Sequence, residues 1–470
     1  MSFRSMRLPP DQILTVAQMR VAEAALIAGG TSVDTLMQRA GRGAAEWVWR
    51  IGGGRAVTVL TGPGNNGGDG WVIAETIRQR GGEVRVVAAD NPATPAAQNA
   101  RAAYKGPVLD AAAAVTGEVL VDCLFGSGLT RPLSGDHLAL LTRLAASHHK
   151  RVAVDLPSGI DADLGMPLNR DLPPFDLTLA LGAWKFAHFL MPACAAMGQL
   201  RLVDIGVEPL AGAAEVVTRP RLPMPAPDAH KYTRGLLGVI GGAMPGAAQL
   251  AATAAQGAGA GYVRLLSETG EAPADLVVDR HPLPEALADS RFAALLIGPG
   301  LGRDATARER LDTAAAAQVP LVLDADALVL LGARHLSART APLIATPHEG
   351  EMIALERAFD CLGSGSKADR ARDLARASGM VVVAKGPDTV IAAPDGRLAL
   401  AARASSWLST AGTGDVLAGT IASRLACGAE AFEAACQGVW LHGEAAHRCG
   451  AAFPAGQLAL AIRSAYAACL

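Results

Sequence analysis

Short apolar runs alternate with longer amphipathic segments over most of the chain. Residues 12–50 have helical periodicity, interrupted once by a glycine pair. The remainder of the first half contains apolar or β-branched runs suited to buried parallel strands: Ala56–Leu60, Glu83–Ala88, Val119–Cys123, Arg151–Val154 and Leu177–Leu181. Helical patterns fall between most of these runs. The alternation predicts a parallel sheet covered by helices on both faces, with ligand sites at the carboxyl ends of the strands.

A proline-rich segment interrupts the alternation near the middle of the chain. Residues 207–229 carry prolines at 209, 220, 223, 225 and 227, a composition typical of an extended linker. The pattern then restarts with further apolar runs and closes with helical segments at 412–427, 429–449 and 456–467; the runs are Leu236–Ile240, Ala293–Ile297, Leu321–Leu323, Leu343–Ala345 and Met380–Ala384. We therefore predict two three-layer αβα domains, residues 1–206 and 230–470, joined by a linker at 207–229.

The composition argues against several classes of protein that the α/β prediction alone would allow. Of the 470 residues, 50% are hydrophobic and 18% are charged, as in compact domains. A net charge of −2 gives no electrostatic reason to expect nucleic acid or a membrane as a partner. The seven scattered cysteines form no CxxC pair, so we expect free thiols in a reducing compartment. The N-terminus MSFRSMRLPPDQ lacks the apolar core of a secretion signal, and a cytoplasmic protein is expected.

The first candidate site begins at GPGNNGGDG, residues 62–70, where a strand feeds a glycine-rich turn and a helix expected from Trp71. This position is that of the first turn of a Rossmann-like domain, although the motif is not GxGxxG. Two further strands end in Asp122 and Asp155. Oxygen atoms of Asn66, Asp122 and Ser158 could bind a cation, residues 126–132 could enclose a phosphate, and Asp155 could exchange a proton. The alternative for Asp155 is a turn or capping role.

The second candidate site is TAGTGDVLAG, residues 410–419. Its glycines free backbone amides at a helix start to bind an anion, and Asp415 is placed to deprotonate a hydroxyl that attacks a phosphoryl group. This arrangement is typical of a ribokinase-like small-molecule kinase. Supporting motifs follow other strands: GPGLG at 298–302, DAD at 324–326, TPHEGEM with His348, and AKGPDT at 384–389. Asp415 as a helix cap and His348 as a structural cap are the alternatives.

Several motifs of the first half resemble the NAD(P)H-hydrate epimerase family: LTVAQMR, LMQRAG, GPGNNGGDG, DCLFGSGL and VDLPSGIDADLG, within residues 12–205. The resemblance implies that potassium binds to Asn66, Asp122 and Ser158 and that the substrate binds to Asn65, Asn66, Gly67, Gly68, Asp69, Gly126, Ser127, Gly128, Leu129, Thr130, Arg131, Pro132 and Asp155. Two positions depart from the family pattern. Gln38 replaces a glutamate, and Phe186 follows Lys185 where glycine is common, which weakens Lys185 as a site candidate.

The second half resembles the ADP-dependent NAD(P)H-hydrate dehydratase family over about residues 230–465. The motifs above carry this resemblance together with GVIGGAMPGAAQLAATAAQGAGAG at 238–261 and LHGEAA at 441–446. It implies ADP as co-substrate with Mg²⁺, hydrate binding by Ala247, Gly302, His348 and Asp415, and nucleotide binding by Lys385, Gly386, Pro387, Asp388, Thr389 and Gly414. The family's GGTGD occurs here as AGTGD, with Ala411 at the first position.

Together the resemblances imply a bifunctional isomerase and lyase that repairs hydrated NADH and NADPH. The first half would interconvert the R and S hydrates, with Asp155 as acid and base. The second would phosphorylate the S hydrate from ADP with Asp415 as base, releasing AMP and phosphate. A vitamin kinase of the hydroxyethylthiazole kinase type is the main alternative for the second half, and a nucleotide-sensing or interaction module for the first. We expect a homo-oligomer. The sequence does not decide whether NADHX or NADPHX is the preferred substrate, or whether ADP or ATP is the phosphoryl donor. It also leaves open whether substrate is channelled between the domains, and what Lys185 and Lys231 do.

Overall fold

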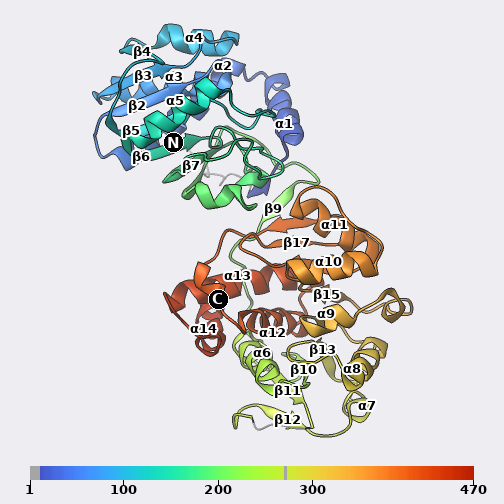
Figure 1. Ribbon diagram of the computed structural model, residues 1–470. Coiled ribbons are helices and arrows are strands. Elements are labelled where there is room, and N and C mark those ends of the chain that lie inside the picture. The colour runs from blue at the N-terminus through green and yellow to red at the C-terminus, as the bar shows by residue number, and fades with distance from the viewer. Residues whose placement is uncertain (1–10, 269–271) are drawn as a thin grey trace. The chain divides into compact units, whose positions relative to one another are not determined.

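The computed structural model describes residues 11–268 and 272–470, and the chain divides between Ala214 and Glu215 into two compact units (Figure 1). Each unit has its own sheet and its own hydrophobic cores. Among the described residues, no helix is both long and apolar enough to cross a membrane. The segment 1–10, which carries most of the region read for a secretion signal, lies outside the described residues.

The first unit is built around a sheet of order β4–β3–β2–β5–β6–β7–β8 in which neighbouring strands are parallel. Its elements in chain order are α1 (Val16–Ala28), α2 (Val33–Gly52), β2 (Val57–Thr61), α3 (Asn65–Gln79), β3 (Val84–Ala88), α4 (Pro95–Ala103), β4 (Val108–Asp110), β5 (Gly117–Cys123), α5 (Gly135–Ala146), β6 (His148–Val154), β7 (Leu177–Leu181) and β8 (Gln199–Val203). The strand order reverses between β2 and β5, which is where a doubly wound sheet binds ligands. The predicted Rossmann-like αβα unit is confirmed.

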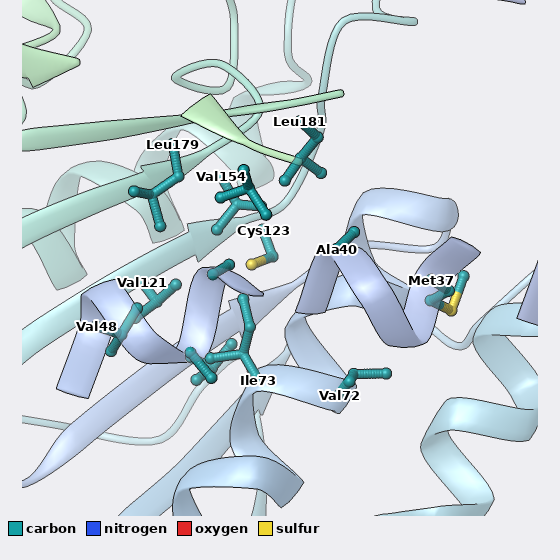
Figure 2. Packing of buried hydrophobic residues seen from close by; sticks show 14 of the residues in the cluster. Met37, Ala40, Val48, Val72, Ile73, Val121, Cys123, Val154, Leu179 and Leu181 are labelled. Carbon is teal, nitrogen blue, oxygen red and sulfur yellow. The ribbon is translucent and has the colours of Figure 1, made fainter. Parts of the chain in front are cut away.

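Alternate residues of these strands pack on opposite faces, as the period of a strand requires. Val59 and Val121 belong to the core formed with α2 and α3, whereas Leu60 and Leu120 belong to the core formed with α5. Figure 2 shows part of the first of these cores. The strand side chains of Val121, Val154 and Leu179 lie there in one cluster with Ile73 of α3. The sheet is thus held from both sides, and its carboxyl edge is a rigid base for the loops that follow.

The second unit contains a longer mixed sheet. From β12 through β11, β10, β13, β14 and β15 to β16 the neighbours are parallel, β17 and β18 follow antiparallel, and β9 pairs parallel with β18. The strands are β9 (Ala214–Val216), β10 (Leu236–Ile240), β11 (Tyr262–Leu266), β12 (Val277–Asp279), β13 (Phe292–Ile297), β14 (Leu321–Leu323), β15 (Leu343–Ala345), β16 (Val381–Ala384), β17 (Val390–Ala392) and β18 (Leu398–Leu400).

Helices cover both faces of this sheet (Figure 1). They are α6 (Pro245–Gly257), α7 (Leu283–Ala286), α8 (Ala305–Ala316), α9 (Asp326–Leu330), α10 (Glu349–Ala358), α11 (Lys367–Ser378), α12 (Thr413–Ala426), α13 (Ala431–Cys449) and α14 (Ala455–Ala467). Helices α6 and α12 pack so closely that a Cβ on Gly419 would lie 2.0 Å from the carbonyl oxygen of Ala251. The predicted pair of αβα domains is confirmed.

Two local predictions differ from the structure. Helix α3 begins at Asn65, so most of the glycine-rich motif is helix and the expected start at Trp71 is wrong. Its glycines allow close packing, since a Cβ on Gly67 would lie 2.0 Å from the Gly62 carbonyl oxygen. Residues 207–229 also make specific contacts: β9 pairs with β18, and the Leu222 amide donates to the Cys469 carbonyl at 3.0 Å. The domain boundaries at 206 and 230 stay a prediction.

Candidate functional sites

A cavity of about 480 Å³ opens at the carboxyl edge of the first sheet. Its walls come from helix α1, the start of α3, the loop after β5, the end of β6 and the turn after β7; the residues are Val16, Met19, Arg20, Glu23, Gly64, Asn65, Asn66, Asp69, Leu124, Phe125, Gly126, Ser127, Gly128, Leu129, Thr130, Arg131, Asp155, Leu181 and Lys185. The volume suits a small-molecule ligand. The loops predicted to converge do meet here.

Asp155 and Lys185 form a buried ion pair in this cavity. Lys185 Nζ lies 2.6 Å from Asp155 Oδ1, and the Lys185 side chain is only 1% exposed. The ammonium also donates to the carbonyls of Leu181 and Ala183, and the Ser127 amide donates to Asp155 Oδ2 at 2.8 Å. Burial alone would raise the pKa of Asp155, but Lys185 and Ser127 outweigh it and lower the pKa to about 2.

The backbone at Asp155 has a φ of 65°, in the left-handed region that a non-glycine residue adopts at a cost. The Asp155 carbonyl accepts a hydrogen bond from Nε2 of the buried His188 at 2.9 Å. Burial lowers the pKa of His188 to about 4, so this imidazole is neutral and acts as donor. The surrounding structure therefore fixes both the backbone and the carboxylate of Asp155.

Asn66, Asp122 and Ser158, the predicted potassium ligands, are all placed near the loop after β5. Ser158 Oγ donates to Asp122 Oδ1 at 2.8 Å and accepts from the Phe125 amide at 2.9 Å. A Cβ built on Gly126 would lie 3.3 Å from the Asn66 amide carbon. Both polar atoms of the Asn66 amide are buried and have no hydrogen-bond partner in the part of the chain that the structure describes.

The donor set of these residues fits a potassium ion. Asp122 is fully buried, burial raises its pKa to about 6, and no ion pair involves it among residues 11–268 and 272–470. A cation would supply the missing charge and a partner for the Asn66 oxygen. Carboxylate, amide and hydroxyl oxygens are ligands of hard cations.

The other predicted substrate contacts divide into two groups. Residues Gly126–Arg131, Asn65 and Asp69 line the cavity, and Asn65 also accepts a hydrogen bond from Thr94 at 2.7 Å. Gly67, Gly68 and Pro132 are not among its lining residues. Gly68 instead packs against Met37, whose side chain would lie 2.4 Å from an added Cβ.

The second site surrounds Lys385, at the carboxyl edge of the second sheet. Lys385 Nζ lies 2.6 Å from Asp324 Oδ1 and 3.8 Å from Glu351 Oε2. A Cβ on Gly414 would lie 3.6 Å from the same nitrogen, which places the start of α12 beside it. Burial lowers the pKa of Lys385, but Asp324 and Glu351 outweigh it and raise the pKa overall, so the ammonium is charged.

Asp415 lies in the first turn of α12, after the N-cap Gly412, whose φ is 90°. Burial and the neighbouring Asp324 raise the pKa of Asp415 to about 6, whereas Lys385 lowers it. Asp324 itself is bound by Thr346 Oγ1 at 2.6 Å as well as by Lys385. With a pKa of about 6, Asp415 is mostly ionised at neutral pH and can accept a proton, as a general base requires.

The predicted nucleotide turn Lys385–Thr389 folds back on itself. Thr389 Oγ1 donates to the Gly386 carbonyl at 3.1 Å, and Lys367 Nζ bonds the Lys385 carbonyl and Asp388 Oδ1 at 3.0 and 2.7 Å. Pro387 lies at the tip, between Gly386 and Asp388. Lys367, which the sequence did not single out, thus fixes this turn from helix α11.

Besides Asp415, three residues were predicted to contact the hydrate, and they lie on three different segments. His348 caps α10 with Nδ1 accepting from the Glu351 amide at 3.2 Å, while 62% of its side chain is exposed. The Gly302 amide donates to Asp326 Oδ2 at 3.0 Å. A Cβ on Gly300 would lie 3.0 Å from Ala247, which places Ala247 against the GPGLG loop. His348 is thus both a cap and an accessible side chain.

Lys231 lies apart from these contacts. Its ammonium lies over the rings of Tyr232 and Tyr262, at 5.1 and 4.9 Å from their centroids. This cation–π arrangement gives the charge a structural partner.

Lys185, helix α1 and Asp324 have a larger part in the two sites than the sequence indicated. Lys185 is the one charged residue in the apolar run LTLALGAWKFAHFL, and that isolation was a usable signal. Arg20 and Glu23 are likewise the charged positions of α1, VAQMRVAEAALIA. Asp324, which the sequence indicated only as part of the DAD motif, is the carboxylate that binds Lys385.

Comparison with known proteins extends over both units. A family model described as YjeF-related protein N-terminus matches residues 33–187, and one described as NAD(P)H-hydrate dehydratase matches residues 237–466. The bifunctional NAD(P)H-hydrate repair enzyme of Mycobacterium leprae is 35% identical over 92% of this chain and 93% of its own length. The corresponding enzyme of Thermosynechococcus vestitus is 32% identical over 92% of both chains.

A solved structure, the ADP/ATP-dependent NAD(P)H-hydrate dehydratase of Bacillus subtilis co-crystallised with ATP and Mg²⁺, is 28% identical and covers 53% of this chain and 95% of its own, with a TM-score of 0.47. The matches to the repair enzymes extend through both units. The alternatives of a vitamin kinase for the second half and a sensing module for the first are therefore not supported. The chain therefore belongs to the family of bifunctional NAD(P)H-hydrate repair enzymes.

Proposed function

We propose that this protein epimerises the R and S hydrates of NADH and NADPH in its first unit and dehydrates the S hydrate in its second, using ADP and releasing AMP and phosphate. The observation that carries the proposal is that each unit holds an ion pair between a lysine and a carboxylate at the carboxyl edge of its sheet, Lys185 with Asp155 and Lys385 with Asp324. Two such sites in one chain suit two consecutive reactions of one damaged cofactor.

In the first unit, Asp155 is the proton-exchanging group and Lys185 keeps it ionised. Potassium binds to Asn66, Asp122 and Ser158, next to residues 126–132 that contact the nucleotide. A potassium ion there supplies positive charge for the substrate phosphates. The residues Asn65 to Asp69 and the loop after β5 bind the rest of the hydrate.

In the second unit, Asp415 removes the proton from the hydrate hydroxyl as that oxygen takes a phosphoryl group from the nucleotide. Phosphate is a far better leaving group than hydroxide, so the ring double bond can then reform. Lys385 stabilises charge on the transferred group. Among the described residues no cluster of three His, Cys, Asp or Glu side chains is placed to hold a metal. Mg²⁺, when bound with the nucleotide, would supply positive charge at the phosphates.

The test uses the full chain with a mixture of R and S NADHX, Mg²⁺ and ADP, and follows the absorbance of regenerated NADH. Wild type should convert the whole mixture. Asp155→Asn should convert only the S fraction, and Asp415→Asn should convert none while still equilibrating R and S. Each variant is thereby the folding control for the other. If NADH does not return with ADP or ATP, the dehydratase proposal is wrong. A cytoplasmic location and a homo-oligomeric state also remain proposals, to be tested by fractionation and by light scattering.

A further inference from the structure

Helix α1 places charged side chains in the epimerase cavity. The Leu14 amide donates to the Trp184 carbonyl at 2.8 Å, and a Cβ on Gly182 would lie 2.7 Å from the Met19 methyl group. These contacts hold α1 against the turn that carries Lys185. Arg20 and Glu23, on the next turns of the helix, line the same cavity as Asp155.

Glu23 has no structural role that would explain it. No hydrogen bond or ion pair joins its carboxyl to another group in the described part of the chain, and its side chain is half-buried. Burial raises the pKa of Glu23, Lys185 and Arg20 lower it, and Asp155 raises it. The charged groups around it are Arg20 on its own helix and Asp69, Arg131, Asp155 and Lys185 on the other walls.

Epimerisation of the hydrate needs two proton transfers. The carbon that changes configuration bears a hydroxyl next to the ring nitrogen. When that C–O bond breaks, the oxygen leaves as water and must gain a proton, while the nitrogen lone pair forms a planar iminium. Water then adds to the other face of the ring and must lose a proton. One water leaves and one enters, so an acid and a base acting together complete the cycle.

We propose that Glu23 is a second catalytic residue of the epimerase, acting as the acid when Asp155 acts as the base. Glu23 gives its proton to the departing hydroxyl, and Asp155 accepts the proton of the entering water. In the reverse direction the two carboxyls exchange roles, so the pair always carries one proton. The inference rests on the proposed role of Asp155 and adds its partner. The different surroundings of the two carboxyls, one bound by Lys185 and one without a bound cation, agree with opposite protonation states.

Asp69 is the competing carboxyl. It lines the same cavity, but it is only 7% exposed, and burial, Asp155 and Glu23 raise its pKa well above the ordinary value. Asp155 is equally buried, so burial by itself does not exclude Asp69. Glu23 is only half-buried and is therefore more accessible than Asp69 to the water that leaves and enters at the ring. The variant Asp69→Asn separates the two carboxyls.

The experiment measures interconversion of purified S and R hydrate by the full chain without nucleotide, so that the dehydratase is silent. Glu23→Gln should lower the rate by about 100-fold. Wild type should lose activity as pH rises through the pKa of Glu23, and this alkaline limb should vanish in Glu23→Gln and return in Glu23→Asp. In H₂¹⁸O, label should enter the hydroxyl at the rate of epimerisation. Glu83→Gln, at an exposed position of the same unit, is the matched control and should behave as wild type.

Three outcomes would overturn the inference. They are a Glu23→Gln variant with wild-type rate and pH profile, an alkaline limb that is lost in Asp69→Asn instead, and epimerisation without entry of label. Thermal unfolding of each variant shows whether a lost rate reflects lost structure. If wild type itself fails to interconvert the hydrates, the proposed epimerase function fails instead, so the two failures are distinguishable.

Discussion

The two sites use the same pair of residue types with opposite results. In the first unit the lysine binds the proposed reactive carboxylate directly, and the pKa of Asp155 falls to about 2. In the second unit Lys385 binds a different carboxylate, Asp324, and the pKa of the proposed base Asp415 rises to about 6. A nearby lysine therefore does not by itself fix the state of a carboxyl. The ionisation state of the carboxyl depends on whether the ammonium binds that carboxylate or another one, and on whether a second negative charge lies beside it.

The largest expected effect comes from removing the lysine that defines the first site. Lys185→Met leaves the Asp155 carboxylate buried without its cation, so the free energy of unfolding of the first unit should fall by about 3–5 kcal/mol. Hydrogen exchange at the β2 and β5 amides measures this unit separately. The double variant with Asp155→Asn should recover much of the stability but none of the epimerase activity. Equal protection in wild type and Lys185→Met would mean that the pair is not an energetic unit.

Alanine substitutions in the glycine-rich segments of the two sites should lower stability for different reasons. Gly67→Ala inserts a methyl 2.0 Å from the Gly62 carbonyl oxygen and should cost about 1–3 kcal/mol in stability, whereas Gly64→Ala meets no atom within 4 Å and should cost little. In the second site Gly412 has a φ of 90°, so Gly412→Ala strains the backbone as well. Urea unfolding of the three variants tests this. Equal midpoints for Gly64→Ala and Gly67→Ala would contradict the packing account.

The two activities should respond differently to acid. A base must be ionised, so dehydratase kcat/KM should fall about tenfold per pH unit below the Asp415 pKa of about 6. Epimerisation should show no such loss in mildly acidic solution, because the pKa of Asp155 is about 2. Rate profiles of both reactions on one preparation make the comparison. Nucleotide binding measured at each pH separates loss of the base from loss of affinity. A dehydratase profile flat through pH 6 would remove Asp415 as the base.

The smallest expected effect is a shift of that acid limb. Asp324→Asn removes a negative charge beside Asp415 and releases Lys385 from its ion pair. Both changes favour the ionised form of Asp415, so the limb should move to lower pH by less than about one unit. The pH profile of dehydratase kcat/KM, measured on Asp324→Asn, tests this shift. Asp326→Asn, a substitution in the same motif, is measured as the control. A shift to higher pH would show that Asp324 does not act on Asp415 through its charge.

The sequence by itself determined the elements and the gathering of the strand-end residues. The runs at 177–181, 236–240, 321–323 and 343–345 are strands with the predicted bounds, because continuous apolar runs of that length can be buried only inside a covered sheet. Ser158 reaches Asp122, and Asp155 reaches Ser127, because parallel strands direct their carboxyl ends to one edge. Short strands in the second unit, such as β17 and β18, were not predicted, since three residues carry too little periodicity.

Only the tertiary structure decided the partners and the charge states. Lys185 reaches Asp155 across 30 positions of chain because the turn after β7 folds back over β6, and no local pattern encodes that approach. The start of α3 at Asn65 depends on Gly62, Met37 and Cys123 packing against glycines that look like a loop. Glu23 enters the cavity because α1 docks on Gly182. Burial and ion contacts set pKa values, and both are properties of the assembled fold rather than of neighbouring residues.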